Sequence, residues 1–278
     1  MGFDLDYGNS LAPGPGRGNA SYVMGIADFF TTASNLSYPP GRSPRDLGYK
    51  VIETDSCWDL SHRDANGSLV VDPSKYPDGL APVVDYLHDR KLMFGLYGDR
   101  GNLDCNRNPG QLGHEQQDAD FLAAHKIDWF KEDSCYDSGD EKVAIAHYSA
   151  FRDALNNTGA KIWFALCGWK PWYAPPDPSI GYEGGLTLGN SWRVGPDTGT
   201  GWSAVLINVD NAASVSKYTG RTANGGGWND GSLLLNPGMG CGGGSSNCMN
   251  EARSQSMFSL WSVLSLNLIM TGNLPLIA

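Results

Sequence analysis

The 278-residue chain lacks any run of lysine and arginine, and its 20 basic residues stand against 30 acidic ones, for a formal net charge of −10. An acidic chain of this kind is a poor partner for nucleic acid or an anionic membrane surface, so neither is expected. The chain also lacks an apolar run long enough to span a membrane. Its five histidines are scattered without ligand spacing, so we expect no metal and no organic cofactor.

The first residues lack the basic and apolar regions of a signal peptide. Other features are nevertheless typical of an exported protein. Six cysteines fit an oxidising compartment, and four Asn-x-Ser/Thr triplets begin at Asn19, Asn35, Asn66 and Asn156. We therefore expect a secreted or lumenal glycoprotein, of the lysosomal or vacuolar kind, whose leader peptide is absent from this chain.

Short apolar segments alternate with segments of helical periodicity. After a first strand near Phe3, strands are predicted at 49–55, 92–97, 127–131, 161–166, 190–193, 225–230 and 268–271. Helices are predicted at 21–32, 79–90, 119–125, 143–155, 205–215 and 256–264. This alternation predicts βα units and a parallel sheet, and eight strands predict an α/β fold of the closed (β/α)8 barrel type. We expect one catalytic domain over residues 1–278.

Polar residues recur where the predicted strands end: Asp55, Tyr97, Asp133, Cys167, Arg193 and Asp230. In a (β/α)8 barrel, catalytic groups sit at such ends. Lys131 and Asp133 lie two residues apart on one strand and should share a face, so the ammonium would lower the aspartate pKa. An ionised carboxylate is what a nucleophile requires. On these residues alone, a salt bridge without chemistry is an equal alternative.

Six separated blocks of the sequence resemble glycoside hydrolase family 27, the α-galactosidases and α-N-acetylgalactosaminidases. The blocks lie at 49–58, 91–105, 128–135, 166–169, 191–197 and 226–230. The resemblance runs from Met1 to about Leu274 in the family's order and spacing. It implies a (β/α)8 barrel followed by a β-sandwich, so the chain is expected to end before the last barrel helix and the sandwich. It also implies a retaining hydrolase that releases terminal α-D-galactosyl residues from a galactose-containing saccharide.

The resemblance assigns Asp133 as the nucleophile and Asp197 as the acid/base. A retaining glycosidase needs one ionised carboxyl group to attack the sugar and one protonated group to donate to the leaving oxygen. Without the resemblance, Asp197 would be interpreted as an ordinary loop residue. The substrate-binding residues that the resemblance implies are Asp55, Tyr97, Lys131, Cys167, Trp169, Arg193 and Asp230. Bulky side chains at Cys167 and Trp169 would favour a sugar 2-hydroxyl over a 2-acetamido group.

The same resemblance implies a Cys105–Cys135 disulfide beside the nucleophile. The spacing of Cys241 and Cys248 allows a second, local bridge that closes a loop. The two remaining cysteines are expected to be free thiols: Cys57 and Cys167.

Several positions depart from the family pattern. Ser56 and Ser232 stand where the family has carboxylates, and a tryptophan of the first strand is replaced near Asp6-Tyr7. Glu132 replaces an aromatic residue that faces the helices, where an unpaired charge is costly. These departures leave two alternatives to an α-galactosidase. One is a hydrolase of the same family for another sugar, such as a β-L-arabinopyranoside or an isomalto-oligosaccharide. The other is a catalytically inactive carbohydrate-binding homologue.

Overall fold

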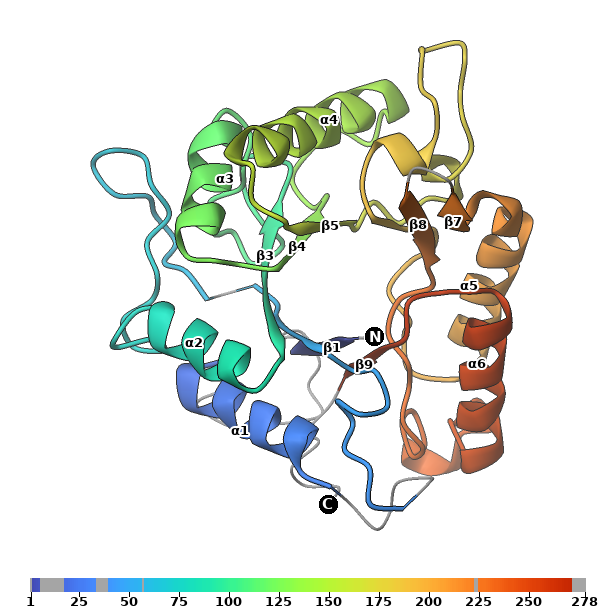
Figure 1. The fold of residues 1–278 in the computed structure, drawn as a ribbon. Helices are drawn as coiled ribbons and strands as arrows, with labels where there is room; N and C mark the ends of the chain where they lie inside the picture. Colours follow the sequence, from blue (N-terminus) through green and yellow to red (C-terminus); the bar gives the residue numbers. More distant parts are fainter. Residues whose placement is uncertain (1, 6–17, 34–39, 57, 223–224, 272–278) are drawn as a thin grey trace. The chain divides into compact units, whose positions relative to one another are not determined.

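The structure is a computed structural model and describes residues 2–5, 18–33, 40–56, 58–222 and 225–271. The chain divides into two compact units, the first formed by residues 1–163 with 272–278 and the second by residues 164–271. The elements of both are labelled along the chain in Figure 1. Within the described residues, no helix combines the length and the apolar character that crossing a membrane requires.

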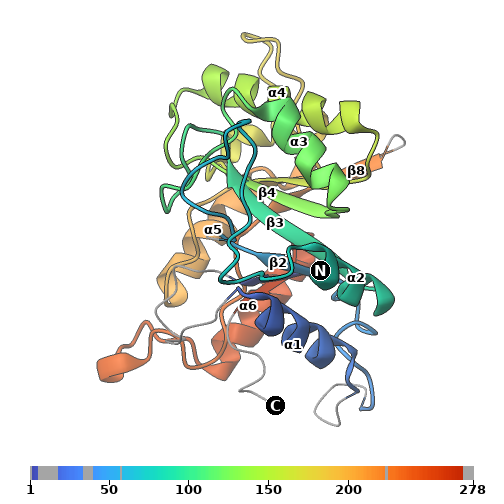
Figure 2. The same cartoon turned by 90° about the vertical axis from the view of Figure 1, so that its left-hand side faces the viewer.

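The first unit is a parallel sheet whose strands alternate with helices. Its strands pair in chain order, with Gly2 opposite Val51, Val51 opposite Met93 and Gly95 opposite Trp129. The strands are β1 (Gly2–Leu5), β2 (Val51–Thr54), β3 (Met93–Asp99) and β4 (Trp129–Asp133). The helices are α1 (Ala20–Thr31), α2 (Ala81–Asp89), α3 (Glu115–Ala124) and α4 (Glu141–Thr158). Figure 2 shows α1 beside α2 and α3 beside α4.

Helix α4 illustrates how local sequence fixes an element of this unit. Its first turn is capped by Asp140, whose side chain accepts a hydrogen bond from the backbone N–H of Val143 at 3.0 Å. It ends at Gly159, whose φ of 71° lies in the left-handed region that glycine adopts without a steric penalty. Its buried face packs on the sheet through Phe151, whose ring centroid lies 5.2 Å from that of Phe130.

The second unit contains a short parallel sheet and two adjacent long helices. Its strands are β5 (Trp163–Leu166), β6 (Ser191–Arg193), β7 (Gly220–Thr222), β8 (Gly225–Asp230) and β9 (Ile269–Thr271). Its long helices are α5 (Trp202–Ser214) and α6 (Glu251–Val263). Short 3₁₀ turns occur at Pro171–Tyr173, Gly185–Thr187, Ser216–Tyr218 and Gly242–Gly244. Strands β5, β6 and β8 pair in parallel, and Leu234 donates its N–H to Ile269 at the start of β9.

The predicted strands and helices are present, with shifts at their ends. Strand β4 begins at Trp129 rather than at residue 127, and just before it the carboxylate of Asp128 accepts the N–H of Phe94 and contacts His88. Strand β7 was not predicted. It pairs antiparallel with β8 as a short glycine-rich hairpin, and such a strand carries little apolar patterning. The expectations for Asp6-Tyr7, Asn35 and Cys57 fall outside the described residues.

Candidate active site

Asp133 is the last residue of β4, and its side chain is buried. Its Oδ1 accepts a hydrogen bond from the backbone N–H of Ser134 at 2.9 Å. Its Oδ2 lies 3.1 Å from the hydroxyl of Tyr97 and 3.5 Å from the sulfur of Cys105. Donors directed at both oxygens stabilise the carboxylate form, which is the form that a nucleophile needs.

Tyr97 comes from the neighbouring strand β3 and is also buried. Burial raises the pKa of its hydroxyl, and the charge of Asp133 raises that pKa further. The hydroxyl therefore stays protonated and can donate to Asp133. The β3–β4 register places Tyr97 opposite Lys131, two residues before Asp133, which explains why these side chains meet.

Lys131 was expected to lie beside Asp133 and to lower the pKa of its carboxyl group. In the structure both side chains reach Tyr97. The Lys131 ammonium lies 5.3 Å from the centre of the Tyr97 ring. Its ion pair, however, is with Asp55 at 2.6 Å, across from the end of β2. Asp55, Tyr97, Lys131 and Asp133 thus form one cluster at the carboxyl ends of three adjacent strands. We call these four residues the Asp133 cluster.

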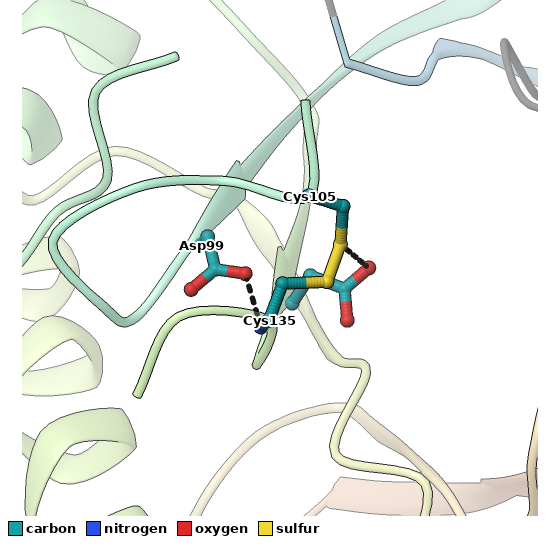
Figure 3. A group of neighbouring side chains, drawn as sticks. Asp99, Cys105 and Cys135 are labelled. Carbon is teal, nitrogen blue, oxygen red and sulfur yellow. Dashed lines mark hydrogen bonds between the residues drawn. A yellow bond between two sulfur atoms is a disulfide. The ribbon is translucent and has the colours of Figure 1, made fainter. Parts of the chain in front are cut away.

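The predicted disulfide between Cys105 and Cys135 is present, and so is that between Cys241 and Cys248. The first bridge has a sequence separation of 30, and by the chain-entropy model such a bridge stabilises the fold by about 3–4 kcal/mol. Figure 3 shows it beside Asp99, whose carboxylate accepts the N–H of Cys135 at 2.6 Å. The bridge and Asp99 together fix the segment that follows Asp133.

Asp99 and Arg100 are two residues beside Asp133 that the sequence did not indicate. Arg100 donates its backbone N–H to the carbonyl of Asp133 at 3.1 Å and its Nε to Ser134 at 3.0 Å. It also forms an ion pair with Asp137. Burial raises the pKa of Asp99 to about 7. The sequence feature that could have indicated them is their own position, an acidic and a basic residue just after the predicted third strand, at the end of the sheet where Asp133 lies.

The second unit holds Asp197 through Arg193, the last residue of β6. One guanidinium nitrogen of Arg193 forms an ion pair with Asp197, and the other lies 3.0 Å from the sulfur of Cys167. The Arg193 side chain is only 5% exposed, whereas that of Asp197 is 79% exposed. A buried cation therefore anchors a carboxylate that is open to solvent and to proton exchange.

Ser232, one of the departures from the family pattern, fixes the loop that carries Asp197. Its hydroxyl accepts the backbone N–H of Thr198 at 3.0 Å, and its own N–H donates to Asp230 at 2.6 Å. The loop is further restrained at Gly195, where an added Cβ would lie 2.1 Å from the amide oxygen of Asn208. Asp230 thus acts on the Asp197 loop through Ser232, a connection that the sequence did not indicate.

Cys167, Gly168 and Trp169 form a rigid turn after β5. Cys167 is buried and forms no disulfide among the described residues, as expected. Gly168 is required because an added Cβ would lie 2.0 Å from the ring of Tyr173. Trp169 has a φ of 59°, an uncommon value for a large side chain, and its buried indole nitrogen has no hydrogen-bond partner among the described residues. Such a fixed donor is suited to a polar ligand.

A comparison with known protein families identifies the chain. The family model for alpha galactosidase A matches residues 26–278. The chain belongs to this family. The resemblance to glycoside hydrolase family 27 is thereby confirmed, and with it the (β/α)8 barrel class of the fold.

Individual family members show the same relationship. The α-galactosidase of Zygotorulaspora mrakii is 33% identical over 79% of this chain and 48% of its own length. The structure of α-galactosidase I from Mortierella vinacea is 27% identical and has a TM-score of 0.76, over 98% of this chain and 66% of that one. The Saccharomyces cerevisiae α-galactosidase with raffinose is 26% identical with a TM-score of 0.74, over 98% and 58%. The chain spans about half the length of the curated relatives that it matches.

Proposed function

We propose that this protein is a retaining glycosidase that releases terminal α-D-galactosyl residues from oligosaccharides or glycoconjugates. The observation that carries the proposal is the buried carboxylate of Asp133, which has donors at both oxygens and stands at a strand end in a chain of the alpha galactosidase A family. The family member solved with raffinose supports a galactoside as the substrate class, because raffinose carries a terminal α-galactosyl group.

In the first step, an oxygen of Asp133 attacks the anomeric carbon, and the bond from that carbon to the leaving oxygen breaks. Asp197 donates a proton to the leaving oxygen, so the leaving group departs as a neutral alcohol. In the second step, Asp197 takes a proton from water, whose oxygen displaces Asp133 from the sugar. Two inversions give net retention, and water is the only co-reactant, so no cofactor is required.

The remaining residues are assigned to sugar binding. Within the Asp133 cluster, Asp55 and Lys131 present a charged pair that can bind sugar hydroxyls, and Tyr97 donates to the nucleophile. In the second unit, Arg193 anchors Asp197, and Cys167 and Trp169 limit the space for a 2-substituent. The last of these sugar-binding positions is Asp230, which also supports the Asp197 loop through Ser232.

The proposal includes the setting of the enzyme. Two disulfides support an oxidising, secreted or lumenal compartment. Asn66 and Asn156, each the first residue of an Asn-x-Ser/Thr triplet, are exposed and so could carry glycans. Residues 1–278 would act as one catalytic domain, with no nucleic-acid or membrane partner.

A second candidate is a hydrolase of the same family for another sugar, and Ser56 is the observation that favours it. A serine hydroxyl at a sugar-contacting position changes which hydroxyl groups the site prefers. A β-L-arabinopyranoside differs from an α-D-galactoside by the absence of the exocyclic CH₂OH group, so a site with weakened contacts to that group would accept it.

A panel of aryl glycosides separates these candidates. The α-D-galactoside is expected to have a kcat/KM at least about tenfold above those of the β-L-arabinopyranoside, α-D-glucoside and N-acetyl-α-D-galactosaminide, since each lost or clashing polar contact costs about 1–3 kcal/mol. The measurement is initial-rate kinetics with substrates that all carry the same leaving group. An arabinopyranoside turned over as fast as the galactoside would instead support the second candidate. Galactose binding without turnover of any substrate would indicate an inactive homologue.

A further inference from the structure

The inference concerns Ser56, which replaces a carboxylate of the family pattern, and the buried side chain of Asp104. The Ser56 hydroxyl is hydrogen-bonded to Oδ2 of Asp104, and both residues are almost fully buried, at 4% and 3% exposure. We propose that Asp104 is a positioning residue that turns the Ser56 hydroxyl into a polarised acceptor for one hydroxyl group of the sugar. The proposal deepens the proposed galactosidase function and rests on it.

Asp104 is held rigidly by the turn that it begins. Its Oδ1 accepts the backbone N–H groups of Asn106 and Asn108, both at 2.8 Å. The Asp104 N–H in turn donates to the carbonyl of Asn108 at 2.8 Å, which closes the turn. Oδ1 is therefore engaged by the turn, and the orientation of Oδ2 toward Ser56 is fixed by the backbone.

The chemistry of this pair determines the direction of the hydrogen bond. An ionised carboxylate only accepts, so Ser56 must donate its single hydroxyl hydrogen to Asp104. Toward any sugar hydroxyl, the Ser56 oxygen can then act only as an acceptor, as the carboxylate that it replaces would. The charge behind the hydroxyl polarises it and strengthens this acceptor character.

Ser56 is hydrogen-bonded to the Asp133 cluster, and Asp104 lies next in the chain to Cys105, which contacts that cluster. The N–H of Ser56 donates to Oδ1 of Asp55 at 2.7 Å, and Asp55 belongs to the cluster. Asp104 precedes Cys105, whose sulfur lies 3.5 Å from the nucleophile oxygen of Asp133. The pair is therefore placed where a sugar bound for attack by Asp133 would present its hydroxyl groups.

A purely structural role does not explain why residue 104 carries a charge. An asparagine would close the same turn through its side-chain oxygen. The charge also has a cost nearby, because Asp59 is buried and its pKa is raised to about 7, first by burial and then by the charge of Asp104. Asn108 joins the two carboxyl groups, since its side-chain amide donates to Asp59 at 2.9 Å. The feature that asparagine could not supply is the charged acceptor facing Ser56.

Asp104→Asn is the sharpest test, because it keeps the turn and reverses the polarity of the pair. The new amide group would donate to the Ser56 hydroxyl, which would then present a hydrogen rather than a lone pair. We expect Asp104→Asn and Ser56→Ala each to lower kcat/KM for an aryl α-D-galactoside by about 10- to 100-fold, mainly through KM. The matched control is Asp64→Asn, because Asp64 also accepts the N–H groups two and four residues on, in an exposed turn.

Monodeoxy aryl galactosides and a charge exchange distinguish recognition from folding. One deoxy substrate, which lacks the hydroxyl bound by Ser56, should show equal kcat/KM with the wild type and with Asp104→Asn. Ser56→Asp alone places two carboxylates together, so its kcat/KM should be lowered. Adding Asp104→Asn to this variant should raise kcat/KM again by at least about tenfold. Melting temperatures verify that each variant is folded.

The outcomes separate the inference from the proposed function. The inference alone would be overturned if the wild type hydrolyses the galactoside but Asp104→Asn lowers kcat/KM equally for every deoxy substrate. It would also be overturned if the kcat/KM values of Asp104→Asn and Asp64→Asn do not differ. No galactosidase activity in the wild-type protein would overturn the proposed function and this inference with it.

Discussion

Replacement of Asp133 by asparagine is expected to lower kcat for an aryl α-D-galactoside by at least about a thousandfold, because the variant has no carboxylate to form the glycosyl–enzyme bond. The change is nearly isosteric, so the contacts of Tyr97 and Ser134 at this position can persist as hydrogen bonds to the amide. The measurement is steady-state kinetics with a sensitive leaving group. KM should change far less than kcat, since the substrate-binding residues are untouched.

A matched control is available seven residues further along the chain. Asp140→Asn makes the same chemical change at the N-cap of α4, where asparagine caps as well as aspartate. That variant should retain wild-type kcat and melting temperature. If Asp133→Asn kept more than about a tenth of the wild-type kcat, its carboxylate could not be the nucleophile.

The second large effect is expected from Glu132, which lies on β4 between Lys131 and Asp133. Its side chain is completely buried, and neither carboxylate oxygen has a hydrogen-bond partner among the described residues. Burial raises the pKa of Glu132 well above its usual range, and the charge of Asp99 adds to this effect. Of the other charged groups near it, Arg100 lowers the pKa whereas Glu115 and Asp118 raise it.

Glu132 therefore makes the stability of the fold depend on pH. Its native pKa lies above its unfolded value, so the native state binds a proton that the unfolded state releases. The contribution of Glu132 to stability is therefore fully present below about pH 4.5 and is lost as the pH rises toward the native pKa. Asp99, whose pKa is raised to about 7, contributes in the same direction.

Glu132→Gln removes the charge at nearly constant shape. The quantity to follow is the melting temperature of Glu132→Gln minus that of the wild type. This difference is expected to increase between pH 4.5 and pH 7.5 by at least about 2 °C, which corresponds to roughly 1 kcal/mol in a chain of this size. The comparison across pH cancels the cost of burying the glutamine amide, which is the same at every pH. Calorimetry or circular dichroism melts at several pH values measure it.

Glu183→Gln provides the control, because Glu183 is exposed. Its melting temperature should follow the wild type at every pH. A melting-temperature difference between Glu132→Gln and the wild type that stays constant from pH 4.5 to 7.5 would contradict the account of Glu132.

How far the sequence reveals the site differs from residue to residue. The positions of Asp133 and Tyr97 at strand ends could be predicted from the apolar segments before them, a property of the local sequence, whereas their proposed roles came from the family resemblance. The expectations for Cys167 and Glu132 came instead from the family resemblance. Short-range patterns thus located the elements and the polar groups at their ends.

Apart from the Cys105–Cys135 disulfide, which the resemblance implied, the polar partners described here that lie far apart in the chain could not be predicted. The ion pair of Lys131 with Asp55 joins residues 76 positions apart, and it depends on the order of three strands in the sheet. The Ser56–Asp104 bond spans 48 positions and depends on a turn within a loop. A sequence shows that Ser56 departs from a family pattern but not that another residue supplies the missing charge.

Identification of the residue that becomes covalently attached to the sugar tests the central claim most directly. A 5-fluoro-α-D-galactosyl fluoride carries a good leaving group, and its ring fluorine slows both steps, so the glycosyl–enzyme should accumulate. After digestion, mass spectrometry should locate one fluorogalactosyl group on Asp133, and the Asp133→Asn protein should take up no label. Attachment to any other residue, or turnover of the reagent by the Asp133→Asn protein, would contradict the account.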